Sequence, residues 1–123
     1  VVEDNPDMSV IGDRAQLVSA VGNLIDNAVK YSDQGSIVKV EVRREEGRML
    51  ISVADNGPGI AAEHLGRVFE RFYRVDDARS RGTGGTGLGL AIVRHIALLH
   101  GGDVSVTSVV GVGSTFTLSI PAV

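Results

Sequence analysis

Hydrophobic and polar residues recur along the first half of the chain with two different periods, and these periods predict its helices and strands. Over residues 13–31 the apolar side chains return every three or four positions, which predicts an amphipathic helix with Asp13 as its N-cap. Over residues 36–44 apolar and polar side chains alternate, which predicts a strand with its valines on one face. Glu46-Gly47 then predicts a hairpin turn into a second strand over residues 48–55.

The second half of the chain contains two more segments with the helical pattern and two more with the strand pattern. A possible short strand also lies near the start of the chain, at residues 8–12. The later elements that we predict are a short helix at 62–69, a helix at 90–100 that ends at Gly101-Gly102, and two strands at 104–108 and 114–120 around a turn at Gly111 and Gly113.

The order of these elements, β-α-β-β-α-α-β-β, predicts an α+β fold. Successive strands joined by short turns favour a mixed, mostly antiparallel sheet, and the amphipathic helices need an apolar surface to cover. We therefore expect a two-layer α/β sandwich in which about three helices cover one face of the sheet. The chain shows no internal repeat, low-complexity tract or linker, so residues 1–123 form one predicted domain.

Composition and charge narrow the possible functions. With 123 residues and 43% hydrophobic content, the chain can build a real core. A net charge of −3 gives no reason to expect nucleic acid or an anionic membrane as a partner. The sequence has no cysteine, no signal peptide and no run of 18 apolar residues. Because it begins with valine, we interpret it as a fragment of a longer protein.

A glycine-rich segment is the most distinctive local feature. Five glycines fall within residues 82–89, directly before the helix predicted at 90–100. Glycine lets a ligand approach the backbone, and a helix N-terminus favours anions, so the segment is a candidate phosphate-binding loop; a flexible surface loop is the alternative. No lysine follows the glycines as in a P-loop. No buried strand precedes them as in a dinucleotide-binding motif.

The first helix carries a row of polar residues opposite its apolar face. Asn23, Asn27 and Lys30 recur at helical spacing. They form either a solvated face or a source of metal-binding oxygen and phosphate-binding charge. Asparagine is a mediocre helix former, which favours the second interpretation.

The second strand ends in a carboxylate, Asp55. By the period of two, Asp55 shares a face with the strand's apolar residues. A carboxylate on that face needs hydrogen-bond donors. It either caps its own turn or recognises a base, and Gly57 and Gly59 would let a flat heterocycle approach the main chain.

These motifs together resemble the catalytic and ATP-binding domain of sensor histidine kinases, a Bergerat-type ATP-binding fold. Five segments carry the resemblance, and they follow one another in the family's order. They are the N box at 23–31, the G1 box at 55–60, the F box at 69–74, the G2 box at 85–92 and the last glycine motif at 113–116.

The resemblance implies a nucleotide site. Asn27 would bind Mg²⁺, Asp55 would accept a hydrogen bond from the adenine amine, and Asn23, Lys30 and Arg74 would act on the phosphates as catalytic residues. A lid would extend from about Arg74 to Thr86, with Leu88 packed beneath it. The full set of residues implied to contact MgATP is Asn23, Asn27, Lys30, Tyr31, Asp55, Gly57, Gly59, Ile60, Arg74, Gly85, Thr86, Gly87, Leu88, Gly89 and Thr115.

One position differs between the histidine kinases that this chain resembles and the related ATPases that hydrolyse ATP. Related ATPases have a glutamate that activates water where this chain has Asn23, which cannot act as a base. The resemblance therefore implies transfer of the γ-phosphoryl group to a histidine on a separate helical dimerisation domain, which residues 1–123 lack. A Bergerat-type serine kinase of the anti-sigma-factor kind and a non-catalytic ATP-binding or dimerisation module are the alternatives.

The same resemblance implies a parent protein, a cellular location and partners for the domain. The parent would be a homodimeric inner-membrane sensor with this domain in the cytoplasm, and it would phosphorylate a response regulator. The domain alone would be monomeric, with no contact to membrane or nucleic acid.

Overall fold

Three helices and four strands make up the part of the chain that the computed structural model describes, which is residues 10–31, 37–71, 73 and 89–122. In chain order they are α1 (Arg14–Tyr31), β1 (Val38–Glu45), β2 (Arg48–Asp55), α2 (Ala62–Leu65), α4 (Gly89–Leu99), β3 (Asp103–Val109) and β4 (Gly113–Pro121).

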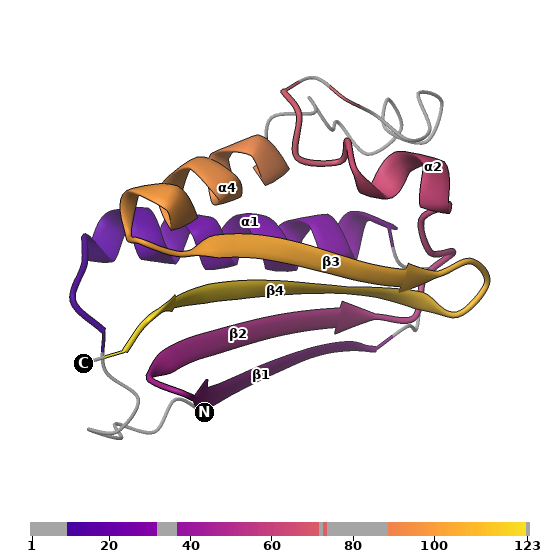
Figure 1. Cartoon of the computed structure of the whole chain (residues 1–123). Coiled ribbons are helices and arrows are strands. Elements are labelled where there is room, and N and C mark those ends of the chain that lie inside the picture. Colours follow the sequence, from indigo (N-terminus) through magenta and orange to yellow (C-terminus); the bar gives the residue numbers. More distant parts are fainter. Residues whose placement is uncertain (1–9, 32–36, 72, 74–88, 123) are drawn as a thin grey trace.

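The four strands form one sheet in the order β1-β2-β4-β3. Each neighbouring pair of these strands is antiparallel, so the expected mixed sheet is wholly antiparallel over the described residues. Helices α1 and α4 lie side by side over one face of the sheet, and α2 lies toward the end where β3 turns into β4 (Figure 1). The predicted two-layer α+β fold is confirmed.

Two predicted boundaries differ from the structure. Of the strand predicted at residues 8–12, Val10 to Gly12 are not in a strand, and the rest lies outside the described residues. The helix predicted at 62–69 ends at Leu65. Beyond it, backbone N–H groups bond to the carbonyl three residues earlier, as from Arg67 to His64 and from Glu70 to Arg67. The segment therefore continues as tight turns rather than as α-helix.

The core lies between the helix layer and the central strand β4. Every second residue of β4 from Ser114 to Ile120 is buried. Phe116 and Leu118 pack there with Val53 of β2, and Leu24 of α1 and Val93 of α4 close the core from the helix side. β1 is an edge strand, and its predicted apolar face stays half exposed.

A histidine ties the end of α4 to the start of α1. The backbone N–H of Asp13 donates to Nε2 of His100 at 3.0 Å, and Nδ1 of His100 donates to the carbonyl of Ile96 at 2.8 Å. The ring is therefore neutral, with its proton on Nδ1. The carboxylate of Asp13 accepts a bond from the N–H of Gln16 at 3.0 Å, which confirms the predicted N-cap.

Replacing His100 with alanine should lower the free energy of unfolding by about 1–3 kcal/mol, because the N–H of Asp13 loses its acceptor. The matched control is His95→Ala, since His95 is exposed on the same helix and should change stability by less than about 0.5 kcal/mol. Urea unfolding of the two variants measures both values. Equal stabilities would show that the His100 contact contributes nothing to holding the two helices together.

Candidate functional site

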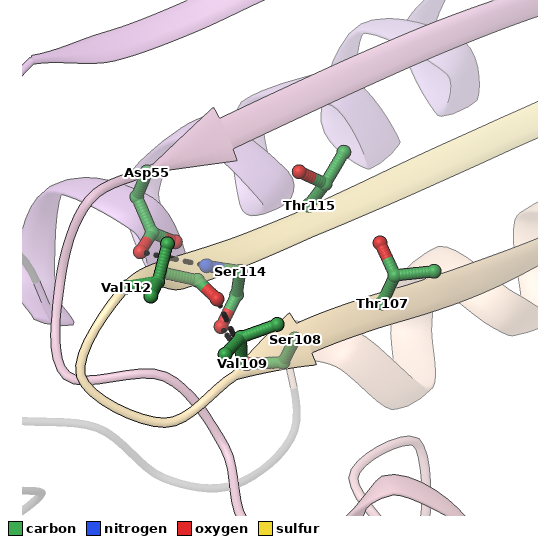
Figure 2. Close-up of a pocket in the computed structure, with 8 residues that line it drawn as sticks. Asp55, Thr107, Ser108, Val109, Val112, Ser114 and Thr115 are labelled. Carbon is green, nitrogen blue, oxygen red and sulfur yellow. Dashed lines mark hydrogen bonds between the residues drawn. The ribbon is translucent and has the colours of Figure 1, made fainter.

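Asp55 stands in a polar row that crosses three strands at one end of the sheet. It pairs with Ser114 of β4, which in turn pairs with Ser108 of β3. One carboxylate oxygen, Oδ1, accepts hydrogen bonds from the backbone N–H of Gly57 at 3.0 Å and of Ser114 at 3.3 Å. Figure 2 shows the bond from Ser114. Asp55 therefore caps its own turn, which is the first of the two roles that the sequence allowed; the second was recognition of a base.

The second oxygen of this carboxylate, Oδ2, has no hydrogen bond or ion pair to the residues that the structure describes. Asp55 is only partly buried, so an outside donor can reach it. A carboxylate accepts hydrogen bonds and donates none, so the row presents one oriented acceptor. Capping and ligand recognition are thus compatible, because they use different oxygens.

The loop after Asp55 packs tightly against the hairpin between β3 and β4. The N–H of Gly111 donates to the carbonyl of Pro58 at 2.8 Å. Gly59 has a φ of +77°, and a Cβ on it would overlap the carbonyl oxygen of Val109. A Cβ on Gly113 would likewise overlap the carbonyl oxygen of Asp55. Glycine at these two positions is therefore explained by backbone packing alone.

A shallow pocket of about 270 Å³ lies beside this hairpin (Figure 2). Because side chains alternate along a strand, Ser114 faces the helix layer and Thr115 faces the opposite side of the sheet. The residues that line the pocket come from both sides: Asp55, Thr107, Ser108, Val109, Val112, Gly113, Ser114 and Thr115.

Thr115, which the resemblance implies as a nucleotide contact, is therefore not placed beside the Asp55 side chain. Ser114 donates to Asp55 instead, and Ser108 is hydrogen-bonded to Ser114. The sequence patterns single out neither serine. A usable signal was present, because counting back by two from the aromatic Phe116 places Ser114 on the core face.

A second group of predicted residues meets where α1 passes the start of α4. The amide nitrogen of Asn23 donates to the carbonyl of Ser19 at 2.9 Å, and its oxygen lies toward the start of α4. A Cβ built on Gly89 would lie 3.2 Å from that oxygen. Asn23 and the first residue of α4 are therefore direct neighbours. Both are partly buried, so they do not lie on a fully solvated face.

Two other predicted residues of α1 lie on the same helix. Asn27 is one turn after Asn23 and is also partly buried. Lys30 pairs with Asp26 at 3.0 Å, so its ammonium already has a carboxylate partner. In Figure 1 the C-terminal end of α1, the start of α4 and the end of β2 all lie toward the same end of the domain.

The aromatic segment after α2 is anchored to the core. The ring of Phe69 meets Phe116 edge to face, with 6.0 Å between ring centres. His64 is hydrogen-bonded to the hydroxyl of Tyr73, and the guanidinium of Arg67 lies 4.6 Å from the centre of the Tyr73 ring. A hydrogen bond with Glu70 raises the pKa of Arg67 above its ordinary value. Phe69 is therefore held to the core, and Tyr73 is held to the region of α2 through His64 and Arg67.

Part of the predicted site lies outside the described residues. This applies to Arg74, Gly85, Thr86, Gly87, Leu88 and the side chain of Tyr31. Their roles stay predictions.

Comparison with known families identifies the domain. The family model "Histidine kinase-, DNA gyrase B-, and HSP90-like ATPase" matches residues 12–123, which is nearly the whole chain. The chain belongs to this family. Within it, the chain is similar to the catalytic domains of sensor histidine kinases.

Three relatives support that narrower assignment. The sensor-like histidine kinase SenX3 of Mycolicibacterium smegmatis is 55% identical over 112 residues, which are 91% of this chain and 29% of SenX3. The structure of the mycobacterial sensor histidine kinase MprB is 38% identical with a TM-score of 0.82, and the match covers 91% of this chain and 76% of that one. Full-length ShkA in complex with AMPPNP is 35% identical with a TM-score of 0.79, over 95% of this chain and 24% of ShkA.

This histidine kinase ATPase domain thus has the fold that the five sequence segments imply. It spans less than a third of SenX3, so the catalytic ATP-binding domain is one part of such a sensor protein. Among the described residues, no helix is long and apolar enough to cross a membrane.

Proposed function

We propose that this domain binds ATP with Mg²⁺ and donates the γ-phosphoryl group to a histidine on a separate helical dimerisation domain. The observation that carries the proposal is the carboxylate of Asp55, because its Oδ1 is held by two backbone N–H groups while none of the described residues bonds to Oδ2. Membership of an ATPase family and the similarity to ShkA, which was solved with AMPPNP, support ATP as that ligand.

Asp55 can select adenine over guanine. The adenine 6-amino group donates hydrogen bonds and can pair with Oδ2, whereas guanine presents a carbonyl oxygen at the same place, which a carboxylate repels. In this proposal Gly57 and Ile60 line the approach of the base along the loop that follows Asp55, and Gly59 serves the packing of that loop against Val109.

The neighbourhood of Asn23 and Gly89 suits the phosphate end of the nucleotide. Gly89 begins α4, and a helix N-terminus presents unpaired N–H groups that favour anions. Lys30 and the side chains proposed from the sequence, Tyr31 and Arg74, would add charge or hydrogen bonds there. Transfer of a phosphoryl group depends mainly on such positioning and charge neutralisation.

A carboxamide oxygen on α1 is a suitable ligand for a magnesium ion that ATP also binds. Mg²⁺ prefers oxygen ligands and usually keeps several waters, so one carboxamide plus phosphate oxygens is a plausible set. Asn27 would be that ligand. Among the described residues, no group of three or more His, Asp or Glu side chains gathers that could hold a metal ion. Phosphate oxygens of bound ATP and water would supply the remaining ligands.

Asn23 supports a kinase rather than a hydrolase. A carboxamide cannot take a proton from water, and the amide nitrogen of Asn23 is already bonded to the carbonyl of Ser19. The phosphoryl acceptor would therefore come from outside this domain. In the full protein it would be a dimerisation domain whose histidine then serves a response regulator, in the cytoplasmic part of a homodimeric membrane sensor.

The proposal is tested by titrating the domain with ATP and GTP in a calorimeter, together with the variant Gly89→Ala. We expect ATP to bind and GTP to bind much more weakly. The added Cβ in Gly89→Ala should crowd the oxygen of Asn23 and weaken ATP binding by about fivefold, comparable to one lost hydrogen bond.

Gly22→Ala is the matched control, because Gly22 is an exposed helix glycine of α1 and a Cβ there would meet nothing within 4 Å. It should leave ATP affinity unchanged and raise the free energy of unfolding by up to about 1 kcal/mol. If the unmodified domain binds no ATP, the proposed function is wrong. If both glycine variants bind ATP equally well, the contact between Asn23 and α4 is no part of the site.

A further inference from the structure

The hydroxyl of Ser108 is the centre of a hydrogen-bond network next to Asp55. Its oxygen lies 2.7 Å from the backbone nitrogen of Ile60, 3.0 Å from the carbonyl oxygen of Gly113 and 2.8 Å from the hydroxyl oxygen of Ser114. A hydroxyl has one hydrogen to donate and two lone pairs that accept. All three contacts form together when Ser108 donates to Gly113 and accepts from Ile60 and Ser114, so this hydroxyl is fully used.

These contacts join both ends of the loop that carries Asp55. Ile60 is at the far end of that loop, and Ser114 donates its backbone N–H to Asp55 at the near end. Ser108 holds both from β3, a strand that is not adjacent to β2 in the sheet. The bond from Ile60 therefore fixes the far end of the loop to β3. The bonds to Gly113 and Ser114 hold the part of the hairpin whose Ser114 Figure 2 shows connected to Asp55.

The position of the Ser114 N–H determines where Oδ1 of Asp55 lies. Because the carboxylate is planar and rigid, the direction of Oδ2 follows from the position of Oδ1. A small displacement of Ser114 or of the loop therefore turns the acceptor away from the base. Misplacement of a recognition group costs affinity even when the group itself is unchanged.

We propose that Ser108 is a positioning residue for base recognition, which sets the direction of the Asp55 carboxylate and hence the preference of the domain for ATP over GTP. This inference rests on the proposed function, in which Asp55 accepts a hydrogen bond from adenine. Ser108 does not itself contact the nucleotide.

The test compares ATP and GTP binding in three variants. Ser108→Ala removes the hydroxyl and leaves the N–H of Ile60 without its partner, so ATP affinity should fall by about fivefold to tenfold. GTP affinity should change by less than about twofold, because GTP makes no bond with Asp55. Ser108→Thr keeps a hydroxyl and should restore most of the ATP preference.

Ser105→Ala is the matched control, since Ser105 lies on the same strand with an exposed side chain and pairs with Thr117 away from the loop. It should bind both nucleotides like the unmodified domain. A merely structural role of Ser108 would instead lower ATP and GTP affinity by the same factor, with no rescue by threonine, and that result would overturn the proposal.

A nucleotide-free measurement separates the role of Ser108 from the proposed function. Amide hydrogen exchange of Ile60 and Gly57 should accelerate at least about fivefold in Ser108→Ala, while the N–H of Ala122, which donates to Gly47 at the other end of the sheet, should stay protected. Unchanged exchange at Ile60 would overturn the role of Ser108 alone. Failure of the unmodified domain to bind ATP would overturn the proposed function, and the role in base recognition with it.

Discussion

Replacing Asp55 with asparagine should reverse the base preference of the domain. The Oδ1 position can remain a carbonyl oxygen that accepts from Gly57 and Ser114, while an amino group takes the place of Oδ2. That amino group opposes the adenine amine and can donate to the guanine carbonyl. We expect ATP affinity to fall by about tenfold to a hundredfold, and GTP affinity to rise, as measured by calorimetry.

Asp55→Ala separates the two oxygens of this carboxylate. Alanine removes the acceptor for the backbone of Gly57 and Ser114 as well as the contact to the base, so this variant should lose ATP affinity and also stability. The free energy of unfolding should fall by about 1–3 kcal/mol in Asp55→Ala and change little in Asp55→Asn. If Asp55→Asn still prefers ATP as strongly as the unmodified domain, Asp55 does not recognise the base.

Much of the fold was predictable because it follows from local periodicity. The alternation before and after Glu46-Gly47 gave β1 and β2 to within two residues, and the apolar stripe gave α1 with its cap at Asp13. In each case the signal and the structure depend on neighbouring residues, so no distant part of the chain was needed to interpret them.

Two of the missed features depend on contacts between distant segments. His100 binds the start of α1, 87 residues away, and nothing near His100 in the sequence indicates that partner. Gly59 was interpreted as room for a ligand, but the structure shows that the backbone of Val109 occupies the space where its Cβ would be. Sequence patterns show that a residue is unusual, whereas only the fold shows what it touches.

The prediction of Thr115 illustrates how sensitive a strand is to register. A shift of one residue exchanges the two faces of the sheet, so Ser114 lies on the side of Asp55 and Thr115 on the other. The buried alternation through Phe116 and Leu118 contained this information. The family resemblance places a glycine motif at 113–116, and the period of the strand shows that Ser114 rather than Thr115 lies on the side of Asp55.

The domain alone should not phosphorylate itself. Both ring nitrogens of His100 already have hydrogen-bond partners. Nδ1 of His64 is hydrogen-bonded to the hydroxyl of Tyr73. His95 lies on α4, roughly 9 Å along the helix axis from Gly89 at a rise of about 1.5 Å per residue. In-line transfer needs the reacting atoms about 3–3.5 Å apart. Incubation with γ-labelled ATP should therefore leave the chain unlabelled, although it binds the nucleotide.

Under the proposed function, adding the helical dimerisation domain proposed for the parent protein in trans should produce label on that domain's histidine. The label should be stable to base and lost in acid, as expected for a phosphohistidine rather than for a phosphoserine. Asp55→Ala is the control in the same mixture and should reduce labelling at low ATP concentration, because it weakens ATP binding rather than the acceptor. Acid-labile label on the isolated chain would show that one of its own histidines reaches the γ-phosphate, and acid-stable label on an added protein would instead favour the serine kinase alternative.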